Sequence, residues 1–164
     1  MTVTPWRRLG VLCVLGLTLP LAACSGDEPL PAGDAVEHYD TAADAVAEAL
    51  GAAGTTWTLA EKGRSVREDD GRCRYTPGSW NPDSPLDVPQ GDDAWQERID
   101  AVSPALQEHG FAAVSKPSSE GSRQILETED AHGASLSITA EGRIRIWDAE
   151  VAADPCTAQT LGIE

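Results

Sequence analysis

The chain has 164 residues, with 12 Lys and Arg against 27 Asp and Glu, which gives a formal net charge of −15 and a length typical of one domain. Such an acidic surface argues against binding to nucleic acid, or to an anionic bilayer by charge, because both are polyanions that require a basic footprint. Apolar residues make up 41% of the chain, which is enough for one modest hydrophobic core and excludes wholesale disorder.

The first 23 residues have the pattern of a secretory signal. Arg7 and Arg8 precede an apolar run over residues 9–21 that is too short to span a bilayer comfortably, and small residues follow it. Residues 21–24, Leu-Ala-Ala-Cys, resemble a bacterial lipobox. In that class of signals the thiol of the cysteine receives a diacylglycerol and a peptidase cuts before it, so the resemblance implies lipidation of Cys24.

This interpretation divides the chain into a signal peptide over residues 1–23, a lipidated cysteine with a flexible spacer over 24–35, and one domain over 36–164. Acyl chains on Cys24 would hold the domain on the extracytoplasmic face of the cell membrane without a basic patch. An ordinary cleaved signal, with Cys24 incidental, is the alternative. The twin arginines fit Tat export, but Trp6 departs from that pattern, so Sec and Tat are both open.

Two cysteines, Cys73 and Cys156, are left in the mature chain once Cys13 departs with the leader and Cys24 is acylated. Outside the cytoplasm such a pair is most simply a disulfide. It would close a loop of about 84 residues, which the chain-entropy model values at up to about 4.5 kcal/mol. A metal or redox pair fits less well, because the chain has no Cys-x-x-Cys and no histidine pair with ligand spacing.

Hydrophobic periodicity predicts two helices. One covers residues 36–52 and ends at Gly51 or Gly54, and the other begins after an N-cap at Asp93 and ends at Gly110. Its apolar stripe is Trp95, Ile99, Val102 and Leu106, and Pro104 predicts a kink or a restart. We expect residues 77–92, rich in Pro, Asn and Asp, to form a loop.

The strand predictions depend on turn residues. A run over residues 55–60 precedes a hairpin around Asp70-Gly71, whose register pairs Glu68 with Cys73 and Val66 with Tyr75. Strands near 123–129, 134–139 and 143–151 follow. Three-residue turns ending at Gly133 and Gly142 predict four facing pairs: Leu126 with Ile138, Thr128 with Leu136, Leu136 with Ile146, and Ile138 with Ile144.

These elements predict an α+β fold in the order α-β-β-α-β-β-β, with two helices packed on one side of an antiparallel sheet and one disulfide. The chain also resembles the small secreted lipoproteins of actinobacteria, of the LppA-like sort. The lipobox carries the resemblance together with a set of sparse positions: residues 71–77 (Gly-Arg-Cys-Arg-Tyr-Thr-Pro), Trp80, Gly133-Ala134 and Cys156. It implies a cell-envelope lipoprotein of unassigned biochemical role, and it carries over no catalytic residues.

Candidate catalytic groups all have simpler explanations. His38 is expected to be solvated near a helix start, His109 suits a helix C-terminus, and His132 lies in a turn. No Gly-x-Ser-x-Gly elbow is present. The acidic clusters lack EF-hand spacing, and a carboxylate pair for glycoside hydrolysis is not evident. We therefore expect no enzymatic activity, no cofactor and no metal.

The predicted register places Arg143, Arg145 and Trp147 on the outer sheet face, with Arg123 nearby. A tryptophan beside arginines on an acidic protein is a candidate surface for an anionic or sugar ligand, or for a protein partner. Alternatively, a β-bulge near Trp147 turns the ring inward and the arginines pair with Glu127 across the strands.

The sequence thus predicts a membrane-anchored envelope lipoprotein that acts as a binding or assembly module. Its partner would be an envelope protein, a lipid or a glycan. The alternative is a carrier or sensor of a small lipid or glycan, which would require a sizeable cavity between the helices and the sheet.

Overall fold

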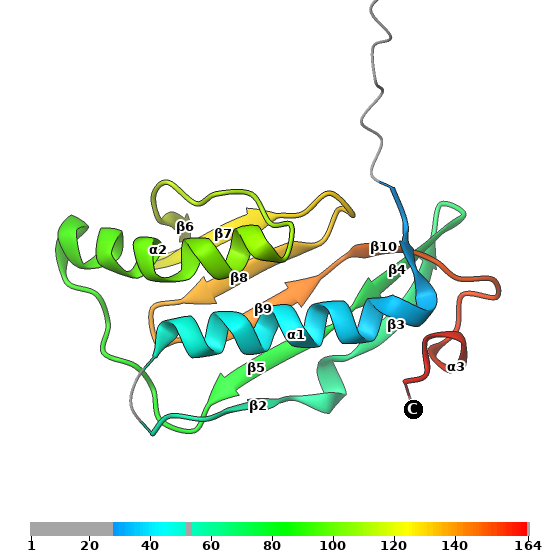
Figure 1. Ribbon diagram of the computed structural model, residues 1–164, viewed down its shortest axis with the longest axis horizontal. Helices are drawn as coiled ribbons and strands as arrows, with labels where there is room; N and C mark the ends of the chain where they lie inside the picture. The colour runs from blue at the N-terminus through cyan, green and yellow to red at the C-terminus, as the bar shows by residue number, and fades with distance from the viewer. Residues whose placement is uncertain (1–27, 52–53, 164) are drawn as a thin grey trace, which may run out of the picture.

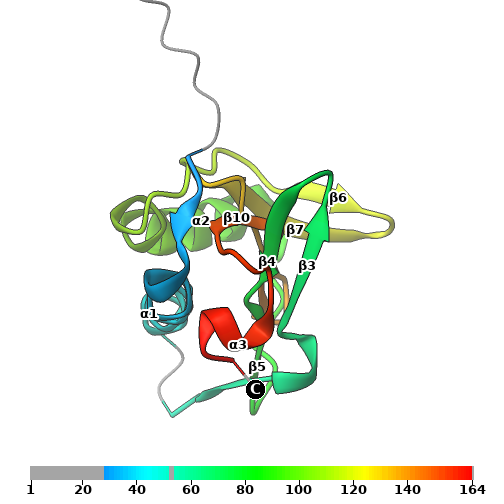
Figure 2. The same ribbon diagram turned by 90° about the vertical axis from the view of Figure 1, so that its right-hand side faces the viewer.

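Two long helices cover one face of a six-stranded sheet, and a four-stranded sheet continues from one end of it (Figure 1). Seen from the end, both helices lie on the same side of the strands (Figure 2). The computed structural model describes residues 28–51 and 54–163. The predicted signal peptide, Cys13 and Cys24 lie outside the described residues.

Helix α1 spans Ala32–Leu50, α2 spans Gly91–Glu108, and α3 is a short turn of helix at Ala158–Leu161. α1 begins earlier than predicted because Leu30, only 8% exposed, pairs with Val151 in the sheet and brings the following residues into the fold. Residues 30–35, expected in the flexible spacer, therefore belong to the domain.

In the described part of the chain, ten strands form the two sheets. Apart from the parallel pair β1 and β10, the neighbouring strands there are antiparallel. The smaller sheet has the order β1-β10-β4-β3, with the bounds Leu30–Pro31, Ala149–Ala152, Arg72–Thr76 and Ser65–Asp69. The larger sheet has the order β2-β5-β9-β8-β7-β6, with the bounds Trp57–Leu59, Gly78–Pro82, Ile144–Trp147, Ser135–Thr139, Arg123–Glu129 and Ser118–Glu120. A 3-10 turn, η1, at Glu61–Gly63 connects β2 to β3.

The two sheets share a continuous two-stranded ribbon. β4 is followed directly by β5, and β9 by β10, while β4 pairs with β10 and β5 pairs with β9. The ribbon bends at Gly78, with φ of 130°, and at Asp148, with φ of 63°. The strand predicted over 143–151 is thus two strands in two sheets, because the left-handed backbone at Asp148 redirects the chain.

The predicted registers are confirmed. Val66 pairs with Tyr75 in the first hairpin, Leu126 with Ile138 between β7 and β8, and Ile138 with Ile144 between β8 and β9. The α+β class is also confirmed, and the predicted order appears as α1-β3-β4-α2-β7-β8-β9 with further short elements added.

Strand β5 corrects the expected loop over residues 77–92. It lies between β2 and β9, and its Trp80 is only 4% exposed. Pro82 is tolerated because it closes the strand, where the missing N–H interrupts no central ladder.

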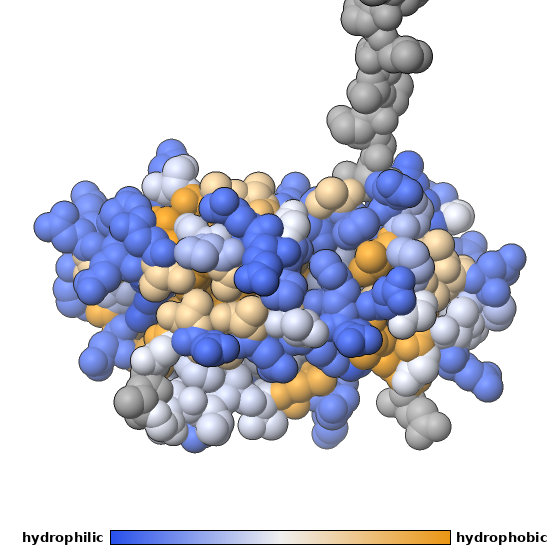
Figure 3. Space-filling model, viewed as in Figure 1, coloured by the Kyte–Doolittle hydropathy of each residue, from blue (hydrophilic) through white to orange (hydrophobic). Residues whose placement is uncertain are grey.

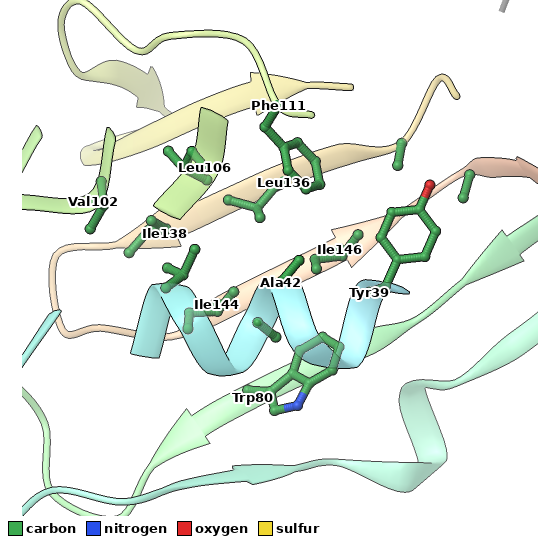
Figure 4. Close-up of a cluster of buried hydrophobic side chains, with 14 of the residues drawn as sticks. Tyr39, Ala42, Trp80, Val102, Leu106, Phe111, Leu136, Ile138, Ile144 and Ile146 are labelled. Atoms are coloured by element: carbon green, nitrogen blue, oxygen red, sulfur yellow. The ribbon is translucent and has the colours of Figure 1, made fainter. Parts of the chain in front are cut away.

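The core lies between the helices and the larger sheet (Figure 4). α1 contributes Tyr39 and Ala42, α2 contributes Val102 and Leu106, and the strands contribute a fully buried aliphatic layer: Leu136, Ile138, Ile144 and Ile146. The predicted stripe on α2 is buried as expected. The outward faces of α1 and α2 are mostly hydrophilic, with hydrophobic residues in small separate areas (Figure 3).

Helix α2 differs from its prediction at both marked positions. Its N-cap is Gln90, without a side-chain capping bond, and Asp93 lies inside the first turn, where a carboxylate still favours the helix dipole. The helix runs on through Pro104, and the hydroxyl of Ser103 donates a 2.6 Å hydrogen bond to the carbonyl of Ile99.

The predicted disulfide joins Cys73 of β4 to Cys156, which follows β10. It ties the first hairpin to the C-terminal segment across 83 positions of sequence. Because β4 and β10 are already neighbours, the covalent bond extends an existing strand contact.

Candidate functional site

The candidate site is the outer face, the side of the larger sheet opposite α1 and α2. Strand β9 alternates buried Ile144 and Ile146 with exposed Arg145 and half-buried Trp147. The Arg145 guanidinium lies 4.9 Å from the centroid of the Trp147 ring, so both side chains share this face and form a cation–π contact.

The alternative with a β-bulge near Trp147 is wrong. Tyr75 pairs with Ala149 on one side of the bend and Gly78 with Ile146 on the other, which is three residues along each strand. Neither strand therefore contains the extra residue that defines a bulge. Trp147 stays in register opposite Ser135 of β8.

The expected pairing of the arginines with Glu127 is also absent from the described part of the chain. Across the sheet, Glu127 faces Ser137, and Ser137 faces Arg145, so a serine separates the opposite charges by one strand. The ion pairs among the described residues all use four other arginines: Arg64, Arg67, Arg72 and Arg74.

The contrast with the smaller sheet is informative. There Arg72 and Arg74 approach the buried carboxylate of Glu150 at 3.1 and 3.5 Å, and Arg67 lies 2.8 Å from Asp148. In a protein with 27 Asp and Glu, an exposed arginine would ordinarily form an ion pair with a carboxylate. On the outer face, Arg123, Arg143 and Arg145 are exposed, and their guanidinium groups make no ion pair or hydrogen bond with the described residues.

Two of these arginines line one cleft of about 270 Å³. Arg123 comes from the start of β7 and Arg143 from the end of the β8–β9 turn. The cleft is completed by polar side chains and two prolines: Asn81, Thr139, Glu141, Pro82 and Pro85. Arg145 and Trp147 do not line this cleft, so the four predicted residues form two neighbouring groups along the same face.

The turn that presents Arg143 is held by several hydrogen bonds. The N–H of Gly142 donates to the carbonyl of Thr139 at 3.0 Å, and the N–H of Arg143 donates to the Thr139 hydroxyl at 3.2 Å. The indole N–H of Trp57 donates to the Gly142 carbonyl at 2.8 Å. Gly142 has φ of 90°, the left-handed conformation predicted for it.

A second cleft, of about 360 Å³, lies between the end of α1 and the start of α2 and is lined partly by Val88 and Arg98. It is a weaker candidate for ligand binding, because the Arg98 guanidinium already donates hydrogen bonds to the carbonyls of Asp87 and Ala140. Burial lowers the pKa of Arg98, and the nearby carboxylate of Glu141 opposes that effect.

The histidines were each expected to be unremarkable, yet the fold brings all three together. The ring centroid of His38 lies 6.3 Å from that of His109 and 6.1 Å from that of His132. Nε2 of His38 is buried and has no partner among the described residues, so its expected solvation is wrong. Sequence reasoning missed this cluster because its members are distant in the chain and no local motif connects them.

Burial lowers the pKa of His38, Asp130 raises it, and His132 and His109 lower it further by charge repulsion. His132 also contacts the backbone carbonyl of Glu28 through Nδ1, close to the start of the described residues. Within residues 28–51 and 54–163, no three His, Cys, Asp or Glu side chains are grouped so that they could hold a metal ion. No helix in that part combines the length and apolarity needed to cross a membrane.

No protein-family profile matches this chain, and no curated protein matches its sequence. Among solved structures, the crystal structure of LppA from Mycobacterium tuberculosis, described there as a presumed lipoprotein, is similar with a TM-score of 0.51. The two sequences are 13% identical over 82% of this chain and 83% of LppA. At that identity the likeness concerns the fold, and this chain therefore shares a distant lipoprotein-like fold with LppA.

Proposed function

We propose that this chain is a lipid-anchored lipoprotein of the extracytoplasmic membrane face whose domain binds an envelope partner or ligand through the outer face. The lipobox at residues 21–24, the disulfide and the distant fold relation to LppA support the location. A binding role is favoured over catalysis because the sequence offers no nucleophile elbow or comparable catalytic motif.

One observation carries the binding role: within residues 28–51 and 54–163, three exposed arginines have no charged partner and lie on a sheet face that neither α1 nor α2 covers. In a protein of net charge −15, arginines that have no acidic partner within the described residues are unusual, because the arginines of the smaller sheet are paired with carboxylates. Arginine and tryptophan are the residue types that most often dominate binding energy at interfaces. Arg145 stacked on Trp147 supplies both in a preformed arrangement.

The carrier alternative is less well supported. A carried lipid or glycan would need space between the helices and the sheet, and that layer is occupied by closely buried side chains such as Leu106, Ile138 and Ile146 (Figure 4). The outer face requires no such opening.

The binding role is tested by site-specific photo-cross-linking in the native cell. A photoreactive amino acid replaces Glu127, an exposed acid on the outer face, and in the matched control it replaces Asp44, an exposed acid on α1. We expect a reproducible adduct from position 127 that is lost in Trp147→Ala and absent from position 44. Equal adducts from both positions, or none from either, would overturn the proposal.

The anchor is tested by mass spectrometry of the purified protein. We expect the native chain to begin at a cysteine carrying diacylglycerol, and Cys24→Ser to lack that added mass. Cys13→Ser is the matched control, because its cysteine lies in the leader and its loss should leave lipidation intact. An unmodified N-terminus in the native protein would refute the anchor.

A further inference from the structure

The most specific feature of the outer face is the cleft between Arg123 and Arg143. The two residues are brought together by strand pairing, because Ile125 of β7 lies opposite Thr139 of β8 and Arg143 follows the next turn. The hydrogen bonds of Thr139 and Trp57 with this turn fix its backbone in place. The backbone positions of both arginines are therefore fixed before a ligand binds.

Arg123 and Arg143 line the same cleft, and an anion bound there would be attracted by both positive charges. Guanidinium groups are planar forks of N–H donors that match carboxylate and phosphate oxygens in bidentate geometry. We propose that the Arg123–Arg143 cleft binds an anionic carbohydrate, a sugar carrying a carboxylate or a phosphate. This inference rests on the proposed binding function and names the ligand class for part of its face.

The remaining lining explains why a sugar is favoured over a bare anion. Glu141 is acidic and opposes the approach of an isolated anion, whereas its carboxylate accepts hydrogen bonds from hydroxyl groups. Asn81 and Thr139 add further hydrogen-bonding groups, and Pro82 and Pro85 supply an apolar wall. A volume of about 270 Å³ is slightly smaller than usual ligand sites and suits a single small ring.

The experiment is calorimetric titration of the full-length chain, purified in a non-ionic detergent, with four probes: glucuronate, glucose 6-phosphate, inorganic phosphate and glucose. We expect at least one of the two anionic sugars to bind more tightly than inorganic phosphate, and glucose to give no heat of binding. Preference for glucuronate would indicate a carboxylate ligand, and preference for glucose 6-phosphate a phosphate ligand.

Arg123→Gln and Arg143→Gln should each weaken binding by about 10-fold or more, the effect expected on losing a charge-assisted hydrogen bond. Arg143→Lys should bind with intermediate affinity because it keeps the charge without the fork. Lys62→Gln is the control: it removes the same charge from exposed η1, outside the cleft, and should bind like the native protein. Melting temperatures report whether each variant is folded.

Equal binding of glucose and the anionic sugars, or equal weakening by Lys62→Gln, would overturn the inference. So would the absence of heat with every probe. In that last case an adduct from position 127 would still support the binding function, so the two failures are distinguishable.

Discussion

The hydroxyl of Tyr39 on α1 donates a 2.9 Å hydrogen bond to Oδ2 of Asp130, which lies 91 positions later in the turn between β7 and β8. Oδ1 of the same carboxylate accepts the backbone N–H groups of His132 and Ala134, both at 2.8 Å. Burial and the neighbouring carboxylate raise the pKa of Tyr39, so the phenol stays protonated and continues to donate. One side chain thus holds both the turn and the helix that packs beside it.

We predict that Tyr39→Phe lowers the free energy of unfolding by about 1–3 kcal/mol, because it removes a buried hydrogen bond to a charged acceptor. Tyr75→Phe is the matched control. Both rings are fully buried, but the Tyr75 hydroxyl has no hydrogen-bond partner among the described residues. Urea unfolding should show a clear loss for the first variant and little change for the second. Equal losses would contradict the role assigned to the Asp130 contact.

Folding stability should fall as the pH decreases below about 6.5. Burial lowers the pKa of His38 from 6.5, so the folded state favours the neutral imidazole while the unfolded chain takes up a proton more readily. Stability is then fully present above the unfolded pKa and declines below it. Melting temperatures across pH 8 to 5 should decline less steeply for His38→Gln than for the native protein.

The groups that face His38 are Asp130, His132, His109 and the Tyr39 ring, and each of them remains in that variant. NMR titration of the His38 ring protons in the native protein measures the pKa of His38 directly. A midpoint at or above the ordinary histidine value would contradict the prediction.

Gly142→Ala should destabilise the domain by more than Gly121→Ala. Both glycines have positive φ, which costs an alanine about 1–2 kcal/mol. A Cβ at Gly142 would also lie 2.7 Å from Cγ and Cδ1 of Leu86, whereas a Cβ at Gly121 meets nothing within 4 Å. The added overpacking should cost about 1–3 kcal/mol more in a denaturant titration. Similar losses for the two variants would show that the loop holding Leu86 moves aside freely.

Reduction of the Cys73–Cys156 disulfide should lower the free energy of unfolding by about 2–5 kcal/mol, because the unfolded chain regains the entropy of a long loop. The double variant Cys73→Ser, Cys156→Ser should match the reduced native protein. A reducing agent should leave that variant's unfolding midpoint unchanged. If the reduced protein were as stable as the oxidised one, the disulfide would make no contribution to the free energy of unfolding.

Local signals were sufficient for the strand registers. Glycines at 133 and 142 set the turn lengths, and the alternation of Leu136, Ile138, Ile144 and Ile146 selected the buried face, so the pairings could be derived without the fold. The same alternation placed Arg145 and Trp147 outward. These features depend only on residues close in sequence, where chain geometry leaves few choices.

Other features depend on contacts that local pattern does not encode. Residues 77–82 are predicted to be a loop because Pro and Gly are frequent there. In the structure most of them form β5, which pairs with β2 on one side and β9 on the other. The left-handed backbone at Asp148 could not be predicted from the sequence, because the residue at that position is not a glycine. Asp148 instead sits where Arg67 and Arg74 bind its carboxylate and carbonyl, contacts that exist only after the two sheets assemble.

Strand β1 consists of Leu30 and Pro31 alone, yet it is the first described element after the proposed anchor. If the domain is anchored at Cys24, as proposed, a mechanical force between the anchor and the domain is transmitted through this strand. Because β1 pairs in parallel with β10, tension directed along β1 acts along the strand axis and loads the contacts between the two strands together in shear. The disulfide from Cys156, which follows β10, links the chain covalently to Cys73 of β4. Force that reaches β10 is therefore also transmitted to β4 in the smaller sheet.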